Sequence, residues 1–145
     1  MYRVIAGLAA LAIGATIVYA QNADAIAARK AAMKEYGAAA KAPGGMVKGD
    51  VPFNLTAVQD SLLKIQATSA KGKQVFPDDS KNGETDALPA AFENKADLFA
   101  KFDKLAADAK AAAGAIKDEA SFKSEWPKVV GNCGGCHKAY RKPKQ

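Results

Sequence analysis

The sequence predicts an all-α protein, an antiparallel four-helix bundle, from three observations. Four segments carry apolar residues at spacings of three and four, the period of one helical face. No segment shows the alternation that is typical of a half-buried strand. Two short connections and one longer one join the segments, which favours antiparallel packing of neighbouring helices. With 145 residues, 49% of them hydrophobic, the chain is large enough for one domain with one core.

The first twenty residues are interpreted as a secretory signal peptide. Arg3 gives a positive start, an apolar run extends from Val4 to Val18, and Ala20 supplies the small residue expected before a cleavage site. The run is short for a membrane span; an uncleaved N-terminal anchor is the alternative. The sequence therefore predicts a cleaved signal at residues 1–20 and an exported domain, soluble after cleavage, at residues 21–145.

The first helix is expected over residues 23–41, because Pro43-Gly44-Gly45 is a strong stop signal and predicts a loop. Its inner face is predicted from the helical spacing of Ile26, Lys30, Met33, Gly37 and Ala40. Asn54 is predicted to cap the second helix. The seam of that helix is expected at Leu55, Val58, Leu62, Ile65 and Ser69.

Residues 71–88 are predicted to be a long polar connection, pinned to the core at its start by Phe76. Pro89 is expected to open a third helix, where its missing N–H costs nothing. The inner side of that helix is predicted at Phe92, Phe99, Phe102, Ala106, Ala109 and Ala113, with Leu98 and Leu105 flanking it. The fourth helix is expected from about Glu119 to Tyr140, with either a kink or a later start at Pro127.

The net charge of +6 is spread over lysines that stand at helical spacing among alanines, which predicts a solvated face. Such a surface can also steer an acidic redox partner. There is no basic stripe with interleaved aromatic residues, so nucleic acid is not an expected partner.

The last helix carries the most informative stretch, Cys133-Gly134-Gly135-Cys136-His137. C-x-x-C-H is the attachment signature of a c-type haem. Positions i, i+3 and i+4 lie on one helical face, so both thiols and the imidazole can meet one flat group. Cys133 and Cys136 are predicted to hold haem c covalently, and His137 to be an axial ligand of its iron.

Two other uses of the cysteines compete with this interpretation. A thioredoxin-like redox pair expects a strand before it and a helix N-terminus beneath its first cysteine, whereas the residues before Cys133 look helical. A zinc site needs further ligands, and the sequence contains only two cysteines and one histidine. One haem c per chain is the prediction.

The layout resembles the class II c-type cytochromes, the cytochrome c′ and cytochrome c556 family. The resemblance rests on C-x-x-C-H in the last helix, Tyr140-Arg141 after His137, the Phe76-Pro77 step, and the stretch from Arg29 to Lys34. It implies a left-handed bundle with haem between the helices, and dimers are common in the family. Met33 falls at the family's distal position, where c′ proteins have a non-ligating residue and the c556 branch has methionine. The resemblance is therefore closer to c556.

Elimination from the residues also leads to Met33 as the second iron ligand. With one histidine, ligation by two histidines is impossible, and Met46 follows two glycines in an expected loop. Methionine is also a common gap-filler in cores, which is the alternative for Met33. Arg29, one turn earlier, could pair with a haem propionate or be solvated. Arg141, one turn after His137, resembles the family's basic residue near the proximal histidine, which implies a contact with the imidazole or with a propionate.

These observations predict a periplasmic monohaem cytochrome that exchanges single electrons with redox partner proteins through a His/Met-ligated haem. Nothing in the sequence suggests a catalytic apparatus, so an enzyme is not expected. A five-coordinate cytochrome c′ that binds nitric oxide or carbon monoxide is the second hypothesis. A haem-free thiol–disulfide protein is the third.

Overall fold

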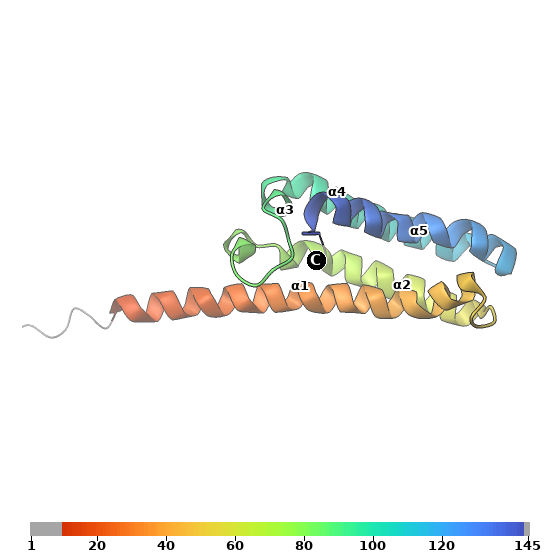
Figure 1. The fold of residues 1–145 in the computed structure, drawn as a ribbon, viewed down its shortest axis with the longest axis horizontal. Coiled ribbons are helices and arrows are strands. Elements are labelled where there is room, and N and C mark those ends of the chain that lie inside the picture. The colour runs from red at the N-terminus through yellow and green to blue at the C-terminus, as the bar shows by residue number, and fades with distance from the viewer. Residues whose placement is uncertain (1–9, 144–145) are drawn as a thin grey trace, which may run out of the picture.

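The computed structural model describes the backbone of residues 10–143 and the side chains of residues 23–143. It is an antiparallel four-helix bundle in which α2 packs against both α1 and α4, and α4 packs against α5 (Figure 1). The described residues form no strand beyond one isolated bridge between Ala87 and Arg141. The predicted fold class is confirmed. The elements are α1 Ala10–Lys48, α2 Leu55–Gly72, η1 Lys73–Val75, η2 Asp78–Lys81, α3 Ala90–Glu93, α4 Lys95–Ala115 and α5 Glu119–Tyr140.

The predicted end of the first helix is wrong, because α1 continues through Pro43 to Lys48. The ring of Pro43 is buried, so its packing offsets the lost backbone hydrogen bond. The true stop is Gly49, which has a φ of 80°. The Asp50 N–H donates to the Gly45 carbonyl, and the Gly49 N–H to that of Met46, at 2.9 and 3.2 Å. This pair of bonds is a Schellman motif.

The buried face of α1 is also rotated from the predicted one. Lys30, Met33 and Gly37 are exposed, whereas the side chains that turn inward are those of Ile26, Arg29, Ala39, Pro43 and Met46. Met46, expected in a loop, is therefore a core residue of the last helical turns.

The predicted signal peptide lies partly outside the described residues, which begin at residue 10. The N-terminal turns of α1 extend past the other helices (Figure 1). No helix in the part of the chain that the structure describes combines the length and apolarity needed to cross a membrane.

The second helix follows its prediction. The Asn54 side chain accepts a hydrogen bond from the Ala57 N–H at 2.9 Å, as an N-cap does. Val58, Leu62, Ile65 and Ser69 of the expected seam are buried.

The third helix is interrupted, contrary to the prediction of one helix from Pro89. α3 ends at Glu93, Asn94 takes a non-helical conformation with φ −111° and ψ 47°, and α4 begins at Lys95. The break turns the inner face by about one residue. The buried side chains of α4 are Leu98, Phe102, Leu105, Ala109 and Ala112, with Phe99 only partly covered.

The fourth predicted helix is observed as α5, with the expected bounds. Asp118 and Ser121 form a reciprocal capping box at its start, and the helix is continuous through Pro127. A later start at the proline is therefore wrong. Phe122, Trp126, Val129 and Tyr140 of the predicted face are buried.

The bundle has two core clusters. The second core cluster comprises Phe76, Ala91, Phe92, Leu98, Phe102 and Tyr140, with Cys136 packed against it. The first core cluster comprises Ala39, Met46, Val58, Leu62, Ile65, Leu105, Ala109, Ala112, Ile116, Phe122, Trp126 and Val129. Burial of Phe76 confirms that it pins the long connection to the core.

Gly72 is required where α2 ends against the second core cluster. A Cβ atom on Gly72 would lie 2.6 Å from two ring atoms of Phe102. We expect Gly72→Ala to lower the free energy of unfolding by about 1–3 kcal/mol, the usual cost of overpacking. Gly114→Ala is the control, since its Cβ would meet no atom within 4 Å. Thermal denaturation should show the loss at Gly72 and none at Gly114; equal behaviour would contradict the steric argument.

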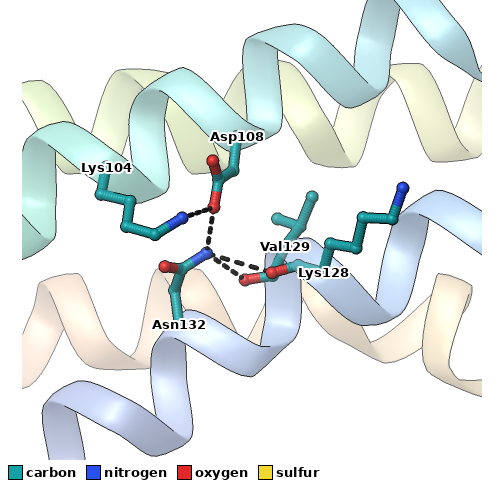
Figure 2. Close-up of polar contacts among 5 residues, drawn as sticks. All are labelled: Lys104, Asp108, Lys128, Val129 and Asn132. Carbon is teal, nitrogen blue, oxygen red and sulfur yellow. Dashed lines mark hydrogen bonds and ion pairs between the residues drawn. The ribbon is translucent and has the colours of Figure 1, made fainter.

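A polar joint fastens α4 to α5 just before Cys133. The Asn132 amide donates to the Asp108 carboxylate at 2.7 Å and to the carbonyls of Lys128 and Val129, each at 3.1 Å. Lys104 donates to the same carboxylate at 2.6 Å (Figure 2). The Lys104 hydrogen bond, followed by that of Asn132, holds the pKa of Asp108 below its ordinary value.

This joint makes part of the stability dependent on pH. A carboxyl whose folded pKa is depressed stabilises the fold above its unfolded pKa of about 3.9, and that contribution is lost as pH falls through the folded pKa. We expect Asp108→Asn to lower the free energy of unfolding at pH 7, and the difference from wild type to shrink below about pH 4. Denaturant titrations across this range provide the measurement. A difference that stays constant would show that the carboxylate charge is not involved.

Candidate functional site

Three potential haem-binding side chains lie near the C-terminal end of α5. Because the helix is continuous from Glu119 to Tyr140, Cys133, Cys136 and His137 share one face, as their spacing predicts. Both thiols are free and partly buried, and Cys136 contacts the second core cluster. The three groups can therefore meet one flat cofactor beside that cluster.

The environment of the cysteines opposes thiol–disulfide chemistry. Burial raises the pKa of the Cys133 thiol and that of the Cys136 thiol. Reactive thiol pairs need the opposite shift, because the thiolate is the nucleophile. The hypothesis of a redox-active disulfide is therefore disfavoured by the structure as well as by the helix before Cys133.

His137 has a cationic neighbour on one side of its ring. Nη1 of Arg141 lies 3.4 Å from Nδ1 of His137, and the Arg141 N–H donates to the His137 carbonyl at 3.1 Å. An iron bond from this imidazole would consequently use Nε2. Arg141 thus lies beside His137, and its role on the proximal side of a haem stays a prediction.

Tyr36, three residues after Met33 on α1, lies near the same cluster as Cys136. Tyr36 packs against both core clusters, and its hydroxyl donates to Ser69 Oγ at 3.0 Å. Burial, the main cause, raises the pKa of Tyr36 to about 12, and the neighbouring Cys133 and Cys136 also raise it. Tyr36 was not among the residues predicted for the site; its place three residues after Met33 was the available signal.

Met33 and Met46 have different surroundings. Met33 is 38% exposed, whereas Met46 is 7% exposed and belongs to the first core cluster. Met33 therefore does not fill a gap in the core, which was the alternative to an iron ligand.

Aromatic rings form the apolar wall beside Cys136. The ring of Phe76 lies 5.9 Å from that of Phe92 and 5.9 Å from that of Phe102, between centroids. The Tyr140 hydroxyl is hydrogen-bonded to Asp97, which raises the pKa of Tyr140 to about 12. These rings are buried and form the apolar part of the core against which Cys136 packs.

Arg29 is buried, so the prediction of a solvated arginine is wrong. Its guanidinium carbon lies 5.1 and 5.3 Å from the ring centroids of Phe76 and Phe92, in cation–π geometry. Nη1 donates to the Val75 carbonyl at 2.8 Å and to Ser80 Oγ at 2.6 Å. The two terminal nitrogens thus bind protein oxygens, and a fork directed at a propionate is not formed.

Two buried donors nevertheless lack a protein acceptor among the described residues. They are Nε of Arg29 and Nε of Arg141, the two arginines predicted to contact the cofactor. Buried donors in native proteins are nearly always paired, so each calls for an oxygen acceptor. Propionate carboxylates are such acceptors. Together with the thiols, the imidazole and the aromatic wall, these donors fit a haem.

A family model described as Cytochrome C′ matches residues 24–141. The chain belongs to this family. Cytochrome c′ of Rhodopseudomonas palustris is 45% identical over 97% of this chain and 94% of its own length. A cytochrome c-556 of Agrobacterium tumefaciens is 38% identical over 79% of this chain and 91% of its own length. These identities alone do not separate the c′ branch from the c556 branch.

The solved structures agree with the family assignment. The structure of cytochrome c′ from Rhodopseudomonas palustris superposes with a TM-score of 0.82 at 47% identity, covering 84% of this chain and 98% of that one. Proteins of the cytochrome c′ family are haem-binding cytochromes, generally periplasmic, with haem c attached covalently. This chain is accordingly a haem c protein, and it has only two cysteines for the attachment.

Proposed function

We propose that the protein is a periplasmic monohaem cytochrome that carries single electrons, with Cys133 and Cys136 bonded to haem c and His137 and Met33 as axial ligands. The observation that carries this proposal is the position of Met33. Its side chain is not buried in the core, and Tyr36, three residues further along α1, packs against the second core cluster as Cys136 does. A methionine placed there would be available as the second iron ligand, together with His137.

The bound haem would supply a reversible one-electron couple. The chain would hold the same two neutral ligands, an imidazole and a thioether, in both oxidation states. The coordination of the iron would therefore change little when an electron is transferred. A His/Met pair also raises the reduction potential. The aromatic residues Phe76, Phe92 and Phe102 would keep water away from the cofactor, and the Nε donors of Arg29 and Arg141 would be available to its carboxylates. This arrangement suits a carrier that serves redox partner proteins, not an enzyme.

The proposal of a periplasmic location rests on the expected signal peptide. We expect cleavage after Ala20, and the N-terminal turns of α1 that this removes extend past the other helices (Figure 1). The bundle would therefore keep its packing after export.

The alternative function is binding of nitric oxide or carbon monoxide at a five-coordinate iron. The partial exposure of Met33 also supports this alternative, because an exposed thioether is held less firmly than a packed one. The optical spectrum of the purified protein separates the two functions. Six-coordinate low-spin haem supports electron transfer with Met33 on the iron, whereas five-coordinate high-spin haem in both oxidation states would favour the gas-binding function.

A further inference from the structure

The chain after α5 is paired with the segment that precedes α3. The Leu88 N–H donates to the Tyr140 carbonyl at 2.9 Å, and the Lys142 N–H to the Asp86 carbonyl at 2.8 Å. These bonds flank the bridge between Ala87 and Arg141. We call residues 85–88 and 140–142 the clasp.

Thr85 joins the clasp to α1. Its hydroxyl oxygen accepts from Nη2 of Arg29 at 3.3 Å and from the Ala87 N–H at 3.1 Å. Its carbonyl accepts from Nζ of Lys142 at 2.8 Å. Thr85 is 8% exposed; its bond to Arg29 is buried, and its bonds to Ala87 and Lys142 are partly buried.

Arg29 anchors the same segment at a second point. Nη2 also donates to the Ser80 carbonyl at 2.8 Å, and Ser80 is fully buried. The long connection after α2 is therefore held on α1 at both Ser80 and Thr85, and from Thr85 it is held to the end of α5. Hydrogen bonds therefore connect α1, through Thr85 and the segment that follows it, to Tyr140 and Lys142, the two residues that flank Arg141.

We propose that the clasp positions Arg141 against the Nδ1 edge of His137, and that Thr85 is its central residue. This inference rests on the proposed role of His137 as an iron ligand. The outer partner of a ligating histidine is ordinarily a carboxylate, a carbonyl or water, which orients the ring and raises its basicity. A guanidinium 3.4 Å from Nδ1 acts in the opposite direction, because a positive charge disfavours the more positive ferric state. The clasp therefore raises the reduction potential.

Thr85→Val tests this in the haem-loaded protein without changing any charge. The valine keeps the β-branched shape and removes the acceptor for Arg29 and for Ala87. We expect a lower reduction potential and an altered electron paramagnetic resonance spectrum of the ferric iron, which reports axial-ligand orientation. Thr85→Ser retains the hydroxyl and is expected to keep the wild-type values.

Lys142→Met provides a second variant, with Lys138→Met as its charge-matched control. Both remove one positive charge close to His137 in sequence, but only Lys142 donates to Thr85. We expect the larger fall in potential for Lys142→Met.

The clasp proposal is overturned if Thr85→Val matches Thr85→Ser in potential and resonance spectrum, even when its melting temperature falls. Equal shifts from Lys142→Met and Lys138→Met would overturn it as well. A wild-type spectrum without histidine-ligated haem would instead remove the proposed function on which the inference rests, so the two failures are distinguishable.

Discussion

Replacing both Cys133 and Cys136 by serine is expected to leave the protein without covalently bound haem. In the proposed attachment each thiol would form one thioether to a vinyl group, so a single replacement should leave one bond and the double replacement none. Haem staining after denaturing electrophoresis measures this directly. A double variant that still carries haem through denaturation would show that these cysteines are not the attachment points.

Loss of haem should also lower the stability of the fold, and more strongly around the second core cluster than around the first. An unfilled cavity costs roughly 24 cal/mol per Å3, and the cofactor is expected beside Cys136 and the second core cluster. The first core cluster retains its own packing between α1, α2, α4 and α5. We expect faster hydrogen exchange in the haem-free protein at the amides of Leu88 and Phe102 than at those of Val58 and Leu62. A cooperative melt at the temperature of the haem-loaded protein would contradict this.

The helices that sequence analysis predicted well are those whose limits are set locally. α5 has a capping box at Asp118 and Ser121, and its buried residues recur at threes and fours, so nearby residues alone determine it. The same holds for Asn54 at the start of α2. The end of α1 was mispredicted because burial of Pro43, a tertiary effect, overrides a strong local stop signal.

The candidate site likewise has one part that local sequence predicts and another that depends on contacts between distant residues. The C-x-x-C-H spacing places Cys133, Cys136 and His137 together because it operates within one helix. The surroundings of Arg29 depend on contacts with Ser80 and Thr85, more than fifty positions further along the chain. No period in the sequence encodes such pairings. The clasp between residues 85–88 and 140–142 is equally non-local, and only the folded chain reveals it.

Met33→Leu is expected to convert the haem from low spin to high spin. The substitution keeps the side-chain volume nearly constant, and such exchanges usually cost under about 1.5 kcal/mol even in a core. Met33 is partly exposed, so the fold should tolerate leucine at this position. The iron then loses its thioether ligand, and with it the rise in potential that a His/Met pair gives. We expect a lower reduction potential and new binding of carbon monoxide by the ferrous protein.

Met46→Leu is the matched control. Met46 lies on the same helix, about 20 Å further along the axis at 1.5 Å per residue, and is buried in the first core cluster. It cannot reach the same iron, so its replacement should leave spin state, potential and carbon monoxide binding unchanged. If the wild type is already high-spin and Met33→Leu leaves its spectrum unchanged, Met33 is not a ligand. The open side of the iron would then be a binding site for nitric oxide or carbon monoxide.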